Sequence, residues 1–301
     1  ELKRILNNIN PHIVNSVSSK PWILCSILSL FFKNVFFLHT VQGLSWHSET
    51  PFLKKNIYHA FELLASMGND KILFVNKSYL KDFKFQKFKN IYIPNSLQFD
   101  NSLQPKVLEE KTLVKLLFVG RIDPQKDVLT LVKAFHLAII NNPSIRLHLD
   151  IVGDDTIGKG LELKKVKDFI LEHPLIDKMI TFHGWQSNIK TFLLDADIFI
   201  SPSIYEGFGI VFLEAGNYYI PVISTKVDGI PEVVMHNHGG FLAQKKDVNQ
   251  LSIYISKLAL DHQLRMKMGN SHGSYVRNNF AKDIIVEKYD NLYSSLVLEM
   301  K

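Results

Sequence analysis

Two carboxylates, Glu206 and Glu214, enclose a segment that begins with glycines and continues as an apolar run. Glu206 stands directly before Gly207, Phe208 and Gly209, where glycine frees the backbone. The amino end of the helix that follows offers unpaired N–H groups to an anion. A negative Glu206 also suits the helix dipole without any ligand, so this residue has a purely structural explanation as well.

Glu214 lacks such an explanation, because we place it about two turns into a helix among apolar neighbours. A carboxylate beside a core needs hydrogen-bond donors, which the hydroxyls of a sugar or a ribose would supply. The alternative is that both glutamates are the acid and base of a glycoside hydrolase, which requires carboxyl groups about 5 to 9 Å apart across one bond. A carboxylate deep in a helix fits that arrangement poorly.

A basic pair, Arg121 and Lys126, follows the apolar run 116–119 and the turn residue Gly120. The planar fork of arginine and the mobile charge of lysine can hold a diphosphate and neutralise it as it leaves. Glycine at such a turn, here Gly120 and after a later run Gly153, lets the backbone approach a ligand closely. Taken alone, a solvated surface pair explains the two cations better.

The elements that must position these residues alternate strictly between strand and helix from Leu113 onward. Short runs dense in Ile, Val, Leu and Phe predict strands buried on both faces at 115–121, 146–153, 179–184, 197–203, 221–225 and 239–243. Apolar residues at three- and four-residue spacing predict helices at 127–140, 161–172, 188–196 and 209–217. This order predicts a parallel, doubly wound sheet, whose ligands bind at the carboxyl ends of the strands.

The first hundred residues follow a shorter version of the same pattern. We predict strands at 12–17, 35–40, 71–76 and 90–95, and helices at 20–32 and 52–67. The polar stretch 100–112, which contains Pro105, reads as a linker. Three amphipathic helices close the sequence, at 248–260, 263–280 and 282–300. We therefore expect an incomplete, acceptor-side Rossmann-like domain over 1–104, a donor-binding Rossmann-like domain over 105–281, and a final helix over 282–301 that packs back on the first domain.

The composition sets broad limits. A chain of 301 residues that is 46% hydrophobic can form two domains with separate cores. The single cysteine, Cys25, excludes an internal disulfide and a cysteine-based zinc cluster, and it favours a reducing, cytoplasmic setting. The apolar segment Trp22–Leu38 is interrupted by Lys33 and Asn34, so we prefer a buried helix followed by a strand to a transmembrane helix. The sequence opens on Glu1 without a secretory leader, as a fragment or a processed chain would.

The net charge of +6 lies entirely in the first third. Residues 1–104 hold 12 Lys and Arg against 6 Asp and Glu, whereas residues 105–301 hold 23 of each. The excess peaks at 76–90, where lysines interleave with Phe83, Phe85 and Phe88. Such a stretch suits the inner face of an anionic membrane or a phosphate-bearing acceptor, and a solvated lysine face explains it equally well. Nucleic acid is a weaker third choice, because no recognised binding module accompanies the charge.

Three motifs together, 119–127, 195–225 and 228–234, resemble the carboxyl-terminal domain of family 4 ("group 1") retaining glycosyltransferases of GT-B fold. Glu206 and Glu214 match the E-x7-E motif of that family, and Arg121 with Lys126 match its basic pair. The resemblance extends from about 113 to 261 and has all three motifs in the family's order. It implies two Rossmann-like domains with parallel sheets, of which the first is incomplete here.

The resemblance also implies a role for each matching residue. Arg121 and Lys126 would bind the donor diphosphate, Glu206 the hydroxyls of the transferred sugar, and Glu214 the ribose. The Gly207–Gly209 backbone would lie along sugar and phosphates. The implied enzyme is a hexosyltransferase that moves a sugar from a nucleoside-diphosphate sugar to a saccharide or lipid-linked acceptor with retention, for a cell-surface polysaccharide or glycolipid. It needs no cofactor and no metal, and it works in the cytoplasm, at most peripheral to the membrane.

The sequence departs from the family pattern in its first third. Gln42 occupies the place of a family histidine, and His39 lies three residues earlier, so both are candidates for the acceptor side. Glutamine keeps the hydrogen bonds of histidine but not its proton exchange, and a histidine that ends a buried strand is more often structural. The opening strand and glycine-rich loop of the family are missing, and we expect truncation. The alternative is a non-catalytic relative that only binds a nucleotide sugar; a GT-B epimerase or phosphorylase fits the motifs less well.

Overall fold

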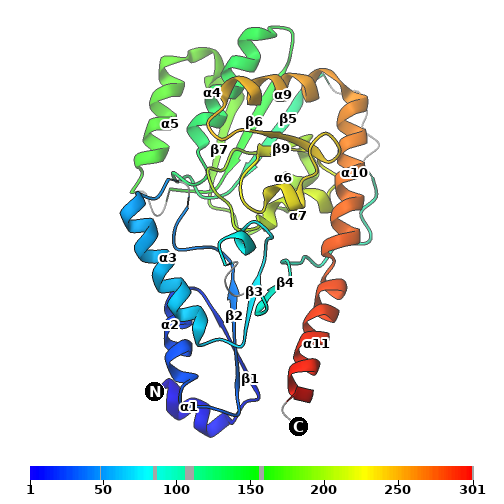
Figure 1. Cartoon of the computed structure of the whole chain (residues 1–301). Coiled ribbons are helices and arrows are strands. Elements are labelled where there is room, and N and C mark those ends of the chain that lie inside the picture. The colour runs from blue at the N-terminus through cyan, green and yellow to red at the C-terminus, as the bar shows by residue number, and fades with distance from the viewer. Residues whose placement is uncertain (48, 84–86, 106–111, 156–158, 300–301) are drawn as a thin grey trace. The chain divides into compact units, whose positions relative to one another are not determined.

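A six-stranded parallel sheet forms the centre of residues 97–281, which make up unit 2 in the computed structural model of the chain (Figure 1). The structure describes residues 1–47, 49–83, 87–105, 112–155 and 159–299. The strands of unit 2 are β5 (Val114–Val119), β6 (Leu147–Val152), β7 (Ile180–Gly184), β8 (Ile198–Ser201), β9 (Val222–Thr225) and β10 (Gly240–Ala243). They lie in the order β10-β9-β8-β5-β6-β7, and every neighbouring pair is parallel.

This order reverses between β5 and β8, which are neighbours in the sheet although β6 and β7 lie between them in the chain. Connections leave the carboxyl ends of these two strands in opposite directions, so a crevice opens there, and ligands of doubly wound sheets bind at this switch point. The loops after β5 and β8 carry the basic pair and Glu206. The strand order therefore places the predicted chemistry at the favoured edge.

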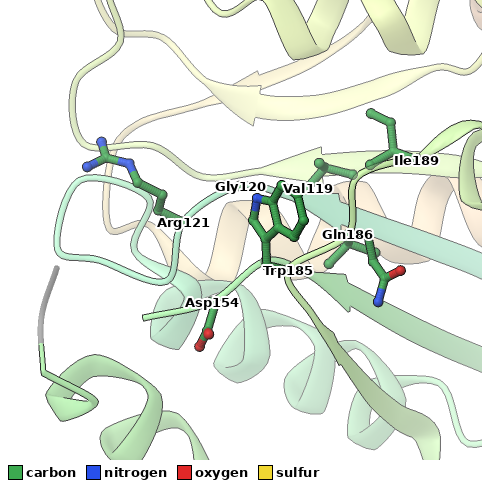
Figure 2. Close-up of a pocket in the computed structure, with 9 residues that line it drawn as sticks. Val119, Gly120, Arg121, Asp154, Trp185, Gln186 and Ile189 are labelled. Carbon is green, nitrogen blue, oxygen red and sulfur yellow. The ribbon is translucent and has the colours of Figure 1, made fainter. Parts of the chain in front are cut away.

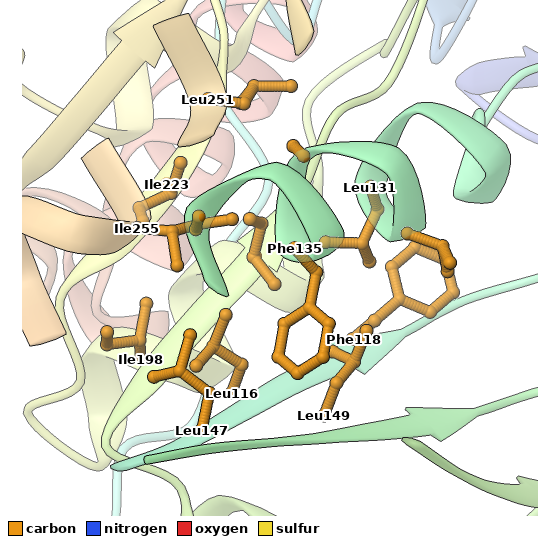
Figure 3. Packing of buried hydrophobic residues seen from close by; sticks show 14 of the residues in the cluster. Leu116, Phe118, Leu131, Phe135, Leu147, Leu149, Ile198, Ile223, Leu251 and Ile255 are labelled. Atoms are coloured by element: carbon orange, nitrogen blue, oxygen red, sulfur yellow. The ribbon is translucent and has the colours of Figure 1, made fainter. Parts of the chain in front are cut away.

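Helices cover both faces of this sheet. They are α4 (Val128–Asn141), α5 (Leu161–Glu172), α6 (Lys190–Asp195), α7 (Ile210–Asn217), α8 (Ile230–Val233), α9 (Val248–Leu260) and α10 (His262–Phe280), with a 3-10 turn, η3 (Pro174–Met179). Figure 3 shows Leu131 and Phe135 of α4 with Leu251 and Ile255 of α9 packed over the strand residue Leu116; all five side chains are fully buried. Burial on both faces explains the unbroken apolar runs of the strands.

Unit 1 consists of residues 1–96 and 282–301. Its sheet is parallel in the order β1-β2-β3-β4, with β1 (Ile13–Val17), β2 (Phe36–Val41), β3 (Lys71–Phe74) and β4 (Asn90–Tyr92). Helices α1 (Leu2–Ile9), α2 (Ser19–Leu28) and α3 (Phe52–Met67) lie on one side of it and α11 (Lys282–Glu299) on the other (Figure 1). Successive side chains of β3 point to opposite faces of the sheet and so enter two hydrophobic cores. Ile72 packs in the core that contains Trp22 of α2, and Leu73 packs in the core that contains Ile285 of α11.

The predicted strands and helices are all present, and the structure differs from the prediction in three respects. The helix expected over 20–32 ends at Leu28 and continues as turns. Helix α2 was also expected to be buried, yet within it only Trp22 and Cys25 are. Helices α1 and α8 were not predicted, since each is too short for a clear apolar period. Within the described residues, no helix combines the length and apolarity needed to cross a membrane.

Candidate functional site

The loops after β5 and β8 meet through an ion pair between Lys126 and Glu206. The two side chains are only 11% and 12% exposed, so the pair is largely shielded from water. Two further bonds join the same loops: Gln125 donates to the carbonyl of Tyr205 over 3.1 Å, and the N–H of Ile204 donates to the carbonyl of Gln125 over 2.8 Å. Residues eighty positions apart in the chain thereby form one rigid wall of the switch-point crevice.

Arg121 holds the outer edge of this wall. Its Nη1 lies 3.1 Å from a carboxylate oxygen of Asp123, and its Nη2 donates to the amide oxygen of Gln125 over 2.9 Å. The Arg121 side chain is 47% exposed, so part of the guanidinium fork faces solvent. The guanidinium is therefore oriented by its neighbours while it stays available to an anion.

Asp123 shapes the turn that carries the basic pair. It is 7% exposed, and its carboxylate accepts a hydrogen bond from the N–H of Lys126 over 3.1 Å in addition to the contact with Arg121. Helix α4 then begins after Asp127, whose side chain accepts from the N–H of Thr130. Sequence reasoning assigned no role to Asp123, although an aspartate three residues before the end of a turn is a common backbone acceptor.

A second acidic residue, Asp228, holds the loop of Glu206. Its Oδ2 accepts from the N–H of Glu206 over 2.9 Å, and the N–H of Gly229 donates to the carbonyl of Glu206 over 3.3 Å. Asp228 has a positive φ of 39°, a conformation that aspartate tolerates better than most residues. The motif 228–234, which the sequence analysis used only as part of the family resemblance, thus fixes the backbone of a candidate catalytic residue.

The remaining residues of the glycine segment serve different purposes. Gly209 caps α7 with a φ of 79°, and a Cβ there would lie 2.5 Å from the ring of Phe212. Phe208 is buried against the ring of Phe280, so it packs rather than faces a ligand. Gly207 is half-buried. Backbone freedom is required at Gly209, where L side chains are strained.

Glu214 is the fifth residue of α7, which begins at Ile210, so it lies little more than one turn into the helix rather than the two turns expected. Its side chain is half-buried, and burial raises the pKa of its carboxyl above the ordinary value. Among the described residues, none donates a hydrogen bond to this carboxylate or forms an ion pair with it. Glu206 and Glu214 therefore have different surroundings: one carboxylate is paired with a cation and the other is poorly solvated and open to a donor.

A pocket of about 240 Å³ opens at the carboxyl ends of β5, β6 and β7 (Figure 2). It is lined by Val119, Gly120, Arg121, Val152, Gly153, Asp154, Trp185, Gln186 and Ile189. Figure 2 shows the indole of Trp185 beside Gly120, with the guanidinium of Arg121 directed away from it. Trp185 is 72% exposed, which is unusual for so large an apolar surface unless something stacks on it. Trp185 was not predicted as a site residue, although it directly follows a predicted strand at the edge of the sheet where ligands bind.

Gly120 and Gly153 form the floor of this pocket through a contact with each other. A Cβ on Gly153, whose φ is 136°, would lie 1.8 Å from the carbonyl oxygen of Gly120. The close approach that the sequence suggested is thus between two strand ends, and it leaves the pocket open above them. A side chain at Gly153 would force the ends of β5 and β6 apart.

The two acceptor-side candidates lie in unit 1 and differ in accessibility. His39 is 2% exposed, its ring stacks on Trp22 at 4.0 Å between centroids, and its Nδ1 lies 2.8 Å from the hydroxyl of Ser16. Burial lowers the pKa of His39 to about 3. Gln42 is exposed and exchanges two hydrogen bonds with the side-chain amide of Asn95, over 3.1 and 2.8 Å. The placement of His39 favours its structural interpretation and leaves Gln42 as the surface candidate.

His236, in the turn before β10, accepts a hydrogen bond from the backbone. The Nδ1 of His236 accepts from the N–H of Leu242 over 3.0 Å, and burial lowers its pKa. In the part of the chain that the structure describes, no three His, Cys, Asp or Glu side chains gather where they could hold a metal ion.

Comparison with known proteins adds a family and a fold. The sequence pattern of the family "Glycosyl transferases group 1" matches residues 100–272, more than half of the chain. The capsular polysaccharide biosynthesis glycosyltransferase CapM of Staphylococcus aureus is 26% identical over 99% of this chain and 82% of its own length. An Escherichia coli enzyme, UDP-Gal:alpha-D-GlcNAc-diphosphoundecaprenol alpha-1,3-galactosyltransferase, is also 26% identical, over 99% of this chain and 79% of its own length.

Among solved structures, Anabaena Alr3699/HepE in complex with UDP and glucose matches with a TM-score of 0.82. The match covers 98% of this chain and 81% of that one at 18% sequence identity, so it bears on the fold alone. Together with the two parallel sheets, it confirms the Rossmann-like GT-B fold class expected from the sequence.

Proposed function

Because the chain belongs to the group 1 glycosyltransferases, we propose that it moves a hexosyl group from a nucleoside-diphosphate sugar to a saccharide or lipid-linked acceptor. The observation that carries the proposal is the meeting of Arg121, Lys126 and Glu206 at the switch point of the unit 2 sheet. Two cations beside a carboxylate at such an edge can bind a diphosphate and a sugar hydroxyl next to each other. The functions for which the S. aureus and E. coli relatives are named support a role in cell-surface polysaccharide or glycolipid synthesis.

The donor is proposed to be a UDP-sugar. The E. coli relative is named for UDP-galactose, and the Anabaena neighbour holds UDP and glucose. We place the nucleotide base in the pocket beside Trp185, since an exposed indole offers a flat surface for stacking. The ribose hydroxyls would donate hydrogen bonds to Glu214. Its carboxylate is half-buried and accepts no hydrogen bond from the described residues of the chain.

The diphosphate would lie between Arg121 and Lys126. In the structure Lys126 is paired with Glu206, so its charge is partly satisfied before any donor arrives. A bound phosphate would share the ammonium group, and Glu206 could then turn its second oxygen to a sugar hydroxyl. The ion pair would thereby couple phosphate binding by Lys126 to sugar binding by Glu206. Asp228 would keep the backbone of Glu206 in place while the Glu206 side chain changes partners.

Transfer would proceed with retention at the anomeric carbon. The bond between that carbon and the phosphate oxygen breaks, the diphosphate departs with its bonding electrons, and the acceptor hydroxyl attacks from the face that the diphosphate leaves. The acceptor proton passes to a departing phosphate oxygen. Arg121 and Lys126 stabilise the negative charge as it develops, which is the role that a metal plays in other transferases. In this scheme neither Glu206 nor Glu214 is a nucleophile, and no cofactor takes part.

A second candidate function, nucleotide-sugar binding without transfer, is favoured by one observation. Gln42 stands where the family has a histidine, and the neighbouring His39 is buried under Trp22, where an acceptor does not reach it. A glutamine can orient a hydroxyl but cannot take up its proton near neutral pH.

Calorimetry with UDP-sugars and GDP-sugars, followed by a transfer assay with the preferred donor, separates these functions. Arg121→Ala should weaken donor binding at least about tenfold and reduce transfer further, because a charge-assisted contact to phosphate is lost. Arg146→Ala is the matched control, since Arg146 is also exposed but precedes β6 at the opposite edge of the sheet. Equal donor affinity in both variants would refute the diphosphate site. Tight binding without transfer to any saccharide or lipid-linked acceptor would favour the second function.

We also propose that the protein works in the cytoplasm, peripheral to the membrane. The surplus of positive charge in residues 1–104 supports this placement, because anionic lipid attracts basic surfaces.

A further inference from the structure

Helices α2 and α3 of unit 1, together with the turn that follows α2, expose a large apolar surface, which we call the α2–α3 face. Its side chains are between 41% and 79% exposed: Ile23, Leu24, Ile27, Leu30, Phe31, Phe52, Leu53, Ile57, Phe61, Leu64 and Met67. Single exposed apolar residues are ordinary, but a contiguous group of this size marks an interaction site.

Helix α3 is turned opposite to the usual orientation of a surface helix. Its apolar residues Leu53, Ile57, Phe61 and Leu64 recur at intervals of three and four, so they lie along one side, and that side faces solvent. The buried side carries Glu62, whose carboxylate accepts from the N–H of Ser45 over 2.8 Å and from the indole N–H of Trp46 over 2.9 Å. Because these donors satisfy the buried carboxylate, the helix is stably docked in this orientation, with its apolar side outward.

The exposed sides of the two helices form one surface. Helix α2 packs against α3 on the same side of the unit 1 sheet (Figure 1). Ile23 of α2 and Phe61 of α3 line a common apolar pocket of about 240 Å³, with Trp22 and Tyr58 beside them. The pocket lies open at the junction of the helices, so an apolar chain could enter between them.

Positive charge borders this surface. Residues 1–67 contain Lys3, Arg4, Lys20, Lys33, Lys54 and Lys55. Against them stand the acidic residues Glu1, Glu49 and the buried Glu62. The ammonium group of Lys3 lies 4.6 Å from the centre of the Phe31 ring, and that of Lys54 lies 5.5 Å from the Tyr58 ring. These cation–π contacts place positive charge directly beside the aromatic side chains of the face.

The basic stretch 76–90 contributes less to such a surface than the sequence suggested. Phe83 is fully buried in the core of unit 1, and Phe85 lies outside the described residues. Phe88 is 77% exposed, and the adjacent Lys89 donates to the carbonyls of Met67 and Asn69 at the end of α3, over 3.3 and 2.7 Å. This end of the stretch thus extends the α2–α3 face.

We propose that the α2–α3 face docks the protein on an anionic lipid bilayer, with α2 and α3 lying in the interface and the bordering lysines among the headgroups. This inference rests on the proposed function, because it gives the peripheral membrane contact a defined surface. Charge complementarity selects the bilayer over a second copy of the chain: two such faces would bring basic borders together, whereas anionic lipid neutralises them. Such docking would bring the transferase to acceptors that are anchored in the same bilayer.

Flotation of the full chain with vesicles tests the proposal, using phosphatidylcholine alone and phosphatidylcholine mixed with phosphatidylglycerol. The wild type should bind the mixed vesicles and bind phosphatidylcholine more weakly. Phe61→Glu should lower vesicle affinity at least ~tenfold, since an apolar ring is lost and a charge is introduced. Lys54→Glu/Lys55→Glu should weaken binding to the mixed vesicles alone. Leu171→Glu is the matched control and should change nothing, because Leu171 is 75% exposed on α5 of unit 2.

UDP calorimetry on the same variants separates this test from that of the proposed function. Phe61→Glu should keep the UDP affinity of the wild type; if it does not fold, Phe61→Ser replaces it with the same expectation. Vesicle binding that is absent in the wild type, or equal in Phe61→Glu and wild type, would overturn the proposal. So would light scattering that shows a dimer which Phe61→Glu dissociates, since the face would then cover a second copy. Loss of UDP binding with intact flotation would count against the donor site alone.

Discussion

The ion pair between Lys126 and Glu206 gives the sharpest test of the site. Lys126→Met keeps most of the side-chain length and removes the charge, so Glu206 is left as a carboxylate that is only 12% exposed and without its cation. Removing one partner of a buried pair costs about 3 to 5 kcal/mol of unfolding free energy. Because both side chains retain some contact with water, we expect about 3 kcal/mol.

The double variant Lys126→Met/Glu206→Gln should recover most of this loss. Glutamine in place of Glu206 carries no charge, so the desolvation cost disappears and about 2 kcal/mol should return. Donor binding should not return, because the cation that faces the diphosphate is still missing. Stability and affinity are thus expected to separate in the double variant, which a merely misfolded protein would not show.

Urea unfolding followed by circular dichroism, fitted with separate transitions for the two units, measures the stability part, and calorimetry with UDP measures the binding part. The matched control is Lys164→Met, which breaks an ion pair with Asp168 whose side chains are 70% and 49% exposed. That variant should lose little stability and keep its UDP affinity. If Lys126→Met behaved like Lys164→Met in both measurements, the Lys126–Glu206 pair would be neither buried in solution nor part of the donor site.

Three further predictions follow from single residues. Glu214→Gln should weaken UDP binding at least about tenfold in calorimetry, because a charged acceptor for the ribose is lost. Thermal unfolding of this variant should show no loss of stability, because burial already penalises the charged carboxylate and raises its pKa. Gly153→Ala should destabilise unit 2 by about 3 kcal/mol or more in urea titration, because its Cβ meets the Gly120 carbonyl at a positive φ; Gly160→Ala, with a φ of 79° and open space around it, should cost only about 1 kcal/mol. Burial lowers the pKa of His272 from 6.5 to about 4, so between these pH values the unfolded chain binds a proton that the folded chain does not. Neutral His272 should therefore contribute about 3 kcal/mol to the free energy of unfolding above pH 6.5, and this contribution should be lost as the pH falls toward 4. His272→Gln should flatten that part of the stability profile, and an unchanged slope would refute the assignment.

Much of the architecture could be predicted from local patterns. Strands buried on both faces appear in the sequence as unbroken apolar runs. The alternation of strand and helix predicts a parallel sheet, which the structure contains. The carboxyl-end rule then pointed to the loops that hold Arg121, Lys126 and Glu206 before any contact among them was known. Trp185 was within reach of the same rule, since it follows a predicted strand, but an isolated tryptophan carries no motif.

Other features were beyond local patterns because they depend on residues distant in the chain. Glu206 could be read as a helix-dipole residue or a sugar ligand, and only the fold brings Lys126 against it. Glu214 was expected among apolar neighbours in α7, and only the fold shows that its side chain is half-buried and receives no hydrogen bond from the described residues. His39 could be read as an acceptor-side residue or as a structural residue at the end of a buried strand, and only the fold stacks the ring of Trp22 on it.

The sequence by itself determined the two sheets, the family and the residue types of the proposed donor site, because periodicity and motif spacing are local properties of a chain. Tertiary structure alone decided which carboxylate is paired with a cation, which glycines touch each other, and which side of α3 faces water. The apolar stripe of α3 would be read from the sequence as its buried side, yet Ser45 and Trp46 satisfy Glu62 inside and leave the stripe exposed. Burial and pairing depend on what the rest of the chain brings to a residue, and a one-dimensional pattern does not contain that information.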